Sequence, residues 1–152
     1  MEAVQIKSIL EDELINLTLH AKNKDEVIQS LVSMMYNAGH IKSIEGFTND
    51  VYLREKEGIT GMGNNVAIPH GKSADVTEAC VAIGRTKELI EWESYDNQPS
   101  RLFFLFAVPN GKEGANLHLK LLSQLATKLA DDEIIEKLKQ SKTIEEFKNY
   151  LA

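Results

Sequence analysis

Residues 102–108 read LFFLFAV, an uninterrupted apolar run, and Pro109, Asn110 and Gly111 follow it directly. A run of this length that ends in turn residues is typical of a β-strand with both faces buried. A strand is buried on both faces only if other elements cover the sheet on each side. The run therefore predicts a sheet at the centre of the domain, with helices packed on both of its faces.

Shorter patterns elsewhere predict the other strands and helices. Alternating or continuous apolar residues predict strands, and apolar residues at helical spacing behind capping residues predict helices. Since the two kinds of element interleave along the chain, we expect an α/β fold, a three-layer sandwich in which a mixed β-sheet carries helices on both faces. The expected strands are 14–19, 66–68, 79–85 and 102–108, and the expected helices are 24–38, 48–57, 116–130, 132–140 and one that opens at Thr143.

Length and charge narrow the class of protein. The 152 residues, 43% of them hydrophobic, contain no repeat and no linker-like stretch, so we expect one domain over residues 1–152. Acidic residues outnumber basic residues 23 to 17, and the net charge of −6 argues against binding to nucleic acid or anionic lipid. The sequence has no signal-peptide pattern, no segment long enough to span a membrane and a single cysteine. These features favour the cytoplasm.

Glycine and proline are concentrated between Gly61 and Gly71, and this segment ends in Pro69-His70-Gly71. Proline fixes the backbone that leads into the histidine, and glycine allows other backbone or a ligand to come close. We expect a short strand to end here, and the carboxyl end of a strand is where α/β folds usually carry their chemistry. The alternative is a tight turn with an exposed histidine and no function.

The same segment resembles two nucleotide-binding motifs, but neither is complete. Gly71-Lys72-Ser73 matches the end of a Walker A loop, which requires a glycine where Val66 stands. Val66 also interrupts a G-x-G-x-x-G pattern that starts at Gly61. We therefore expect no nucleotide cofactor.

His118 is the second candidate for a functional residue. In a helix over 116–130 it falls in the middle of the stripe formed by Leu121, Leu125 and Leu129, one turn from the helix N-terminus. A histidine there is either a core residue or a partner for an anion, since a helix N-terminus presents unpaired N–H groups and positive potential.

Arg54 is the third candidate. It follows Phe47 and Val51 at helical spacing, so a helix over 48–57 directs it toward the apolar, inward side. One interpretation is that its stem simply extends along the core. The other interpretation is that its rigid fork of donors binds phosphate oxygens. An inward arginine together with two inward histidines favours this second interpretation.

Few reactions suit one arginine and two histidines. No H-E-x-x-H motif or carboxylate-rich cluster is present, so we expect no metal, and a metal-dependent hydrolase is the weaker alternative. A serine hydrolase needs a G-x-S-x-G motif, which is absent. Phosphoryl transfer remains, in which one nitrogen of neutral His70 attacks phosphorus while a hydrogen bond to the other nitrogen fixes the tautomer. Arg54, His118 and backbone N–H groups would share the charge of the phosphoryl oxygens.

Three blocks of the sequence resemble a known family. They are REKEGITGMGNNVAIPHG at 54–71, DNQPSRLFFLFAVP at 96–109 and HLKLLSQLA at 118–126. The chain resembles the enzyme IIA (EIIA) type-2 domain of the fructose/mannitol family of the bacterial phosphoenolpyruvate-dependent sugar phosphotransferase system (PTS). The resemblance covers nearly the whole chain, and the blocks keep family-like order and spacing. It implies a mixed sheet between layers of helices, in agreement with the expectation above.

The resemblance also assigns roles to the candidate residues. It implies that His70 accepts phosphate through Nε2 from the phosphohistidine carrier HPr. The phosphate then passes to a cysteine of the IIB component, which phosphorylates the sugar during its transport through the membrane component IIC. His118 and Arg54 are implied to be active-site neighbours, and no cofactor is implied. The residues that match the loop-shaping positions of the family are Gly63, Asn64, Asn65, Pro69 and Gly71.

Some details depart from the family or remain open. The family more often has glycine where Asn65 stands, so asparagine could stiffen the loop. Cys80 lies in EACVAIG, which lacks the loop and proline expected of a IIB cysteine, so we expect it to be packed and expect IIB and IIC to be separate chains. Trp92 is expected to anchor the polar connection 91–100.

The resemblance does not decide the sugar, the choice between transport and regulation, or the oligomeric state. Because two partners must reach His70 in turn, we expect it to be half-buried within a shallow, exposed rim. The 96–109 block is most like the fructose branch, with mannitol or galactitol next. A regulatory, nitrogen-type EIIA is the alternative function, and the oligomeric state is left open.

Overall fold

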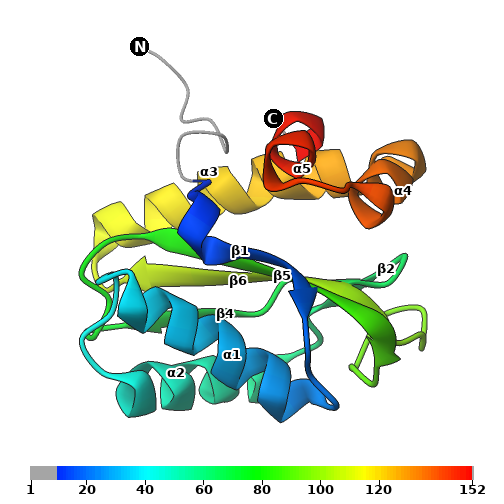
Figure 1. Cartoon of the computed structure of the whole chain (residues 1–152). Coiled ribbons are helices and arrows are strands. Elements are labelled where there is room, and N and C mark those ends of the chain that lie inside the picture. The colour runs from blue at the N-terminus through cyan, green and yellow to red at the C-terminus, as the bar shows by residue number, and fades with distance from the viewer. Residues whose placement is uncertain (1–9, 152) are drawn as a thin grey trace.

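Strand β6 is the central strand of the sheet (Figure 1). On one side it pairs antiparallel with β5, which pairs in parallel with β1. On the other side it pairs in parallel with two short strands in succession, β3 and then β4, and β2 pairs antiparallel with β3. The computed structural model describes residues 10–151, without the side chains of 112–115 and 117–119, and within this part the sheet is mixed and six-stranded. The strands are β1 (Ile15–Leu19), β2 (Gly61–Gly63), β3 (Val66–Ala67), β4 (His70–Ser73), β5 (Cys80–Ile90) and β6 (Ser100–Pro109).

Helices cover both faces of this sheet. Helices α1 and α2 lie on one face, and α3, α4 and α5 lie on the other, so the predicted three-layer α/β sandwich is confirmed (Figure 1). Among the described residues, none of the helices combines the length and the apolar character needed to cross a membrane. The helices are the short 3₁₀ helix η2 (Asp12–Leu14), α1 (Lys24–Asn37), α2 (Ile44–Glu57), α3 (Lys112–Leu129), α4 (Asp132–Gln140) and α5 (Ile144–Leu151).

The apolar run in β6 is buried on both faces, as its sequence predicts. Phe103 and Leu105 belong to the core that contains the buried side chains of α1 and α2. Phe104 and Phe106 belong to the second core, with the buried side chains of α3, α4 and α5. The alternation of side chains along a strand divides the run between two separate cores.

Two helices begin earlier than their apolar patterns predict. Helix α2 begins at Ile44, because the Ser43 side chain caps it by accepting a hydrogen bond from the Gly46 N–H at 3.0 Å. Helix α3 begins at Lys112, directly after Gly111, whose φ of 108° ends the turn that follows β6. In both cases residues before the helix mark where it begins, and the apolar spacing alone starts the helix too late.

The strand expected to end at Pro69-His70-Gly71 is instead interrupted. Strand β3 stops at Ala67, and His70 is the first residue of β4, paired with Phe106. Between the two strands, the Pro69 carbonyl accepts a hydrogen bond from the Phe106 N–H at 3.0 Å. Since proline has no N–H of its own, the ladder is broken at Pro69 but the chain continues along the same side of β6.

Candidate functional site

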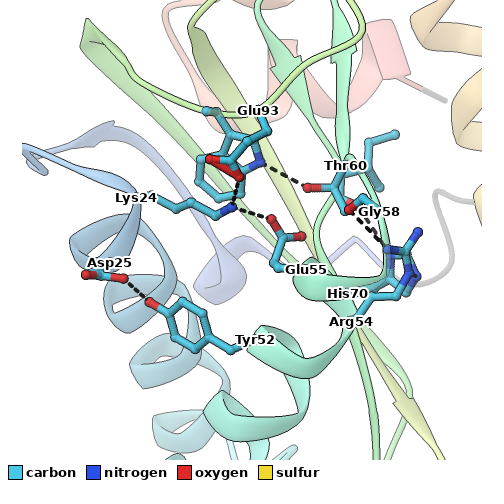
Figure 2. Close-up of polar contacts among 11 residues, drawn as sticks. Lys24, Asp25, Tyr52, Arg54, Glu55, Gly58, Thr60, His70 and Glu93 are labelled. Atoms are coloured by element: carbon cyan, nitrogen blue, oxygen red, sulfur yellow. Dashed lines mark hydrogen bonds and ion pairs between the residues drawn. The ribbon is translucent and has the colours of Figure 1, made fainter.

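His70 is held by contacts at both of its ring nitrogens, and Figure 2 shows Arg54 beside it. The Arg54 Nε–H donates to His70 Nε2 at 2.9 Å, and His70 Nδ1 lies 3.3 Å from the carbonyl oxygen of Ile68. A carbonyl oxygen only accepts hydrogen bonds, so the proton belongs on Nδ1 and the lone pair on Nε2 faces Arg54. This arrangement selects the tautomer in which Nε2 is the nucleophilic nitrogen.

The surroundings of His70 favour its neutral form. Burial lowers the pKa of His70 below the ordinary value of 6.5, and the positive charge of Arg54 lowers it further. The hydrogen bond to the Ile68 carbonyl acts in the opposite direction, but the net shift is downward. A histidine with a lowered pKa is unprotonated at neutral pH, as a nucleophile must be.

Arg54 comes from the last turn of α2 and is partly buried, as its place beside Phe47 and Val51 predicts. Its Nη1 also lies 3.4 Å from the carbonyl oxygen of Gly58, which follows the helix. The guanidinium group is therefore turned toward the strand that carries His70. The expected proximity of Arg54 and His70 is confirmed by this contact.

A pocket of about 370 Å³ opens beside the two residues. Lys72 also lines it, and sequence reasoning gave this residue no role in the site. The signal was available, because residues two apart on a strand face the same side, and Lys72 follows His70 at that spacing in β4. The lining residues are Asp50, Leu53, Arg54, Glu57, His70 and Lys72.

Gly71 allows α2 to approach β4 closely. A Cβ atom on Gly71 would lie 2.9 Å from Phe47 Cε1 and 2.9 Å from Val51 Cγ2, both fully buried side chains of α2. Gly71 was expected to let other backbone or a ligand come close, whereas the atoms that approach it are side chains of the helix that carries Arg54.

Gly71→Ala is expected to lower the free energy of unfolding by about 1–3 kcal/mol, the usual effect of overpacking a dense core. Urea unfolding measures this change. Gly58→Ala is the matched control, because its Cβ would have no neighbour closer than 3.9 Å, and we expect a change within about 0.5 kcal/mol. Equal stability of Gly71→Ala and the parent chain would contradict the close approach of α2.

Gly63, Asn64 and Asn65 form a turn away from the pocket. Asn64 and Asn65, with φ of 55° and 67°, connect β2 to β3 in the left-handed conformation that asparagine tolerates and a tight hairpin requires. The pairing of Val66 with Leu102 and of His70 with Phe106 separates this end of β3 from His70 by about 13 Å along the sheet. These three residues therefore lie at the opposite end of β3 from His70, and none of them lines the pocket.

The asparagine side chains instead fix the hairpin to other elements. Asn64 Nδ2 donates to Asp132 of α4 at 3.0 Å. Asn65 Nδ2 donates to the Pro99 carbonyl at 2.8 Å, and Asn65 Oδ1 accepts from Lys139 Nζ at 2.9 Å. A glycine at position 65 would make neither side-chain contact, so the asparagine provides attachments that glycine cannot.

His118 lies in α3, and its side chain is outside the part of the chain that the structure describes. The position of His118 relative to the helix N-terminus differs from the expected one. Because α3 begins at Lys112, His118 is in the second turn, beyond the unpaired N–H groups of the first turn. The expectation that it stands one turn from the helix N-terminus is therefore wrong.

Cys80 and Trp92 are structural, as expected. Cys80 is buried, and burial raises the pKa of its thiol to about 12, so it is not a thiolate at neutral pH. Trp92 is also buried and donates from Nε1 to Thr60 Oγ1 at 3.0 Å, which anchors the connection between β5 and β6.

Within residues 10–151, the group whose ligand atoms lie close enough together to hold a metal ion is Glu11, Glu13 and His40. His40 Nε2 lies 2.9 Å from a Glu11 carboxylate oxygen, and His40 Nδ1 lies 3.6 Å from Glu78 Oε2. These residues do not line the His70 pocket. A metal-dependent reaction at His70 therefore gains no support from them.

The sequence matches a family model over residues 8–152, described as the phosphoenolpyruvate-dependent sugar phosphotransferase system, EIIA 2. The chain belongs to this family. The predicted resemblance is thereby confirmed, and the EIIA match includes His70, Arg54 and His118.

Two curated relatives are components of fructose systems. The EIIA chain is 34% identical over 140 residues to the fructose-specific EIIABC component of Bacillus subtilis (strain 168), which is 92% of this chain and 22% of that protein. It is 30% identical over 152 residues to the fructose-specific EIIA component of Haloferax volcanii, covering 100% of this chain and 97% of the relative. The chain thus spans about a fifth of the length of some curated relatives it matches and nearly all of another.

A solved structure of the nitrogen regulatory protein IIA-Ntr from Neisseria meningitidis has the same fold. The two chains superpose with a TM-score of 0.86 at 31% identity, over 97% of this chain and 99% of the other. Sugar-specific and regulatory relatives therefore share this EIIA fold.

Proposed function

We propose that this chain is a phosphoryl carrier of the PTS, with His70 as the residue that carries the phosphate. The observation that carries the proposal is the 2.9 Å hydrogen bond from Arg54 Nε to His70 Nε2 at the edge of an open pocket. This hydrogen bond places a neutral nucleophile beside a cation that can bind phosphate oxygens. The fructose-specific relatives and the EIIA family support the same function.

The proposed donor is phospho-HPr, and the proposed reaction conserves one phosphoryl group in each step. The His70 Nε2 lone pair attacks phosphorus, the new N–P bond forms, and the N–P bond of phospho-HPr breaks as its imidazole leaves. The Nδ1–H of His70 continues to donate its hydrogen bond to the Ile68 carbonyl oxygen. This hydrogen bond stabilises the ring as it gains positive charge. The Arg54 donor that occupied Nε2 turns to the phosphoryl oxygens and stabilises their charge.

The proposed acceptor is the cysteine thiolate of a separate IIB component. Its sulfur attacks phosphorus, the S–P bond forms, and the N–P bond to His70 breaks, which restores the neutral imidazole. IIB then phosphorylates the sugar that the membrane component IIC transports, and fructose is the proposed sugar. The donor and acceptor both act in the cytoplasm, so we assign this chain there too, as a single domain over residues 1–152.

The structural likeness to IIA-Ntr favours a second candidate function. In this alternative, phosphorylation of His70 changes the binding of a regulatory protein and no sugar is transported. The chemistry at His70 is the same, so the two functions differ in the acceptor.

Transfer assays test the proposal and separate the two functions. The chain is incubated with phosphoenolpyruvate, enzyme I and HPr, and then with purified IIB components. We expect an acid-labile, base-stable phosphate on His70, located by mass spectrometry, which moves to a fructose-type IIB. A phosphorylated chain that donates to no IIB would favour the regulatory function, and a chain that accepts no phosphate would contradict both.

His118→Ala is expected to slow phosphoryl transfer about 10-fold and to leave some phosphorylation of His70. The physical reason is the loss of one donor to the phosphoryl oxygens while the nucleophile remains. Rapid-quench measurements of phosphorylation by phospho-HPr and of transfer to IIB give both rates. If neither rate changes, His118 has no role in the site.

A further inference from the structure

The N-terminus of α1 is joined to α2 by a partly buried ion pair next to the site (Figure 2). Lys24 Nζ, from the first residue of α1, lies 2.6 Å from Glu55 Oε1 and 2.7 Å from Glu93 Oε2. The Glu55 side chain is only 6% exposed, and its second oxygen is buried without a hydrogen-bond partner. A buried carboxylate with so few partners depends on the one cation that it contacts.

The ion pair is adjacent to the residue that contacts His70. Glu55 follows Arg54 directly in α2, so any movement of Glu55 also moves Arg54. Helix α2 is also tied to α1 by the Tyr52 hydroxyl, which donates to Asp25. The last turn of α2, from which Arg54 reaches His70, is thus fixed to α1 at two points.

A second path leads from Lys24 to the other nitrogen of His70. Lys24 Nζ lies 4.8 Å from the centre of the Trp92 ring, and Trp92 Nε1 donates to Thr60 Oγ1 at 3.0 Å. The Thr60 carbonyl accepts from the Ile68 N–H at 2.9 Å, and the Ile68 carbonyl faces His70 Nδ1. Lys24 is therefore connected to both sides of the imidazole, through Glu55 on one side and Trp92 on the other.

We propose that Lys24 and Glu55 are positioning residues of the phosphoryl-transfer site, which hold the last turn of α2 where Arg54 reaches His70 Nε2. Neither residue lines the His70 pocket, so the pair acts through Arg54 and does not touch the phosphate. A displacement of about 1 Å in a residue that orients a reacting group is enough to slow a reaction substantially. The inference about transfer rests on the proposed phosphoryl carrier function.

The test is the double variant Lys24→Met/Glu55→Leu, which removes both charges and leaves the net charge unchanged. Replacing a buried ion pair by apolar residues is often close to neutral for stability, whereas removing one partner strands the other. We expect phosphorylation of His70 by phospho-HPr to slow about 5- to 10-fold. We also expect the pKa of His70, measured by NMR titration of the imidazole, to rise because Arg54 no longer lies as close.

Two further variants show whether the effect passes through Arg54. Glu55→Asp keeps the charge but shortens the side chain, and we expect smaller changes of the same sign even if the double variant does not fold. In an Arg54→Ala background, the double variant should cause a much smaller change in rate and in the pKa of His70, because only the path through Trp92 remains. Lys148→Met/Asp12→Leu, which removes an ion pair of 2.8 Å that joins α5 to η2, is the matched control and should match the parent chain.

The outcomes are distinct. The proposal is overturned if the double variant and Glu55→Asp keep the parent's transfer rate and His70 pKa, or if their effects persist in full without Arg54. A loss of thermal stability with an unchanged His70 titration would also overturn it, since that result describes a purely structural pair. The titration needs no phosphate donor, so it tests the positioning role even if the parent chain accepts no phosphate. Failure of the parent chain to accept phosphate would contradict only the proposed function.

Discussion

His70→Ala is expected to abolish phosphorylation by phospho-HPr, with a fall in rate of roughly 10⁴-fold or more, the scale on which enzymes respond to loss of the nucleophile. No other described side chain offers a neutral nitrogen beside Arg54 in this pocket. The variant should keep its fold, because His70 is only half-buried at the start of a short strand. The rate is measured as phosphate retained on the protein after reaction with phospho-HPr.

His20→Ala is the matched control for this prediction. His20 is exposed directly after β1 and lines no part of the His70 pocket, so its removal should leave the rate at the parent value. A second control is circular dichroism of His70→Ala, which should match that of the parent chain. Phosphorylation of a folded His70→Ala chain at the parent rate would show that the phosphate is carried elsewhere.

The layered fold could be predicted from the sequence because the side chains of β6 face both sides of the sheet. The unbroken apolar run 102–108 requires cover on each face, and the structure divides these side chains between two cores. The first residues of α2 and α3 were harder to predict, because they follow Ser43 and Gly111 and are not marked by the spacing of apolar residues. Capping and turn residues carry this information, whereas periodicity does not.

In the candidate site, too, features set by neighbouring residues could be predicted, whereas contacts between residues far apart in the chain could not. The proximity of Arg54 to His70 could be predicted, because helical spacing directs Arg54 inward and the proline and glycine around His70 mark an unusual segment. The role of the asparagine turn could not, because Asn64 and Asn65 contact Asp132 and Lys139, far along the chain. Sequence distance concealed the Lys24–Glu55 pair for the same reason.

Arg54→Ala is expected to slow phosphorylation of His70 by about 10²- to 10³-fold, the usual effect of removing one preorganised donor from a developing anion. The variant loses the Nε–H that contacts His70 Nε2 and the positive charge that would face the phosphoryl oxygens. Arg54→Lys should recover only part of the rate, because an ammonium group keeps the charge but not the planar fork. Lys56→Ala, an exposed residue in the same turn of α2, is the matched control and should react at the parent rate.

The pH dependence of the same variant tests why the arginine matters. Only neutral His70 attacks phosphorus, so the rate rises with pH through the pKa of His70 and is constant above it. Burial lowers this pKa, and the charge of Arg54 lowers it further, so the parent chain should lose activity only below about pH 6.5. Arg54→Ala removes the second cause and leaves the first, which raises the pKa and moves the acidic limb to higher pH. An acidic limb that stays in place, in the rate and in the NMR titration of His70, would show that Arg54 acts on the phosphate alone and does not set the protonation state of the nucleophile.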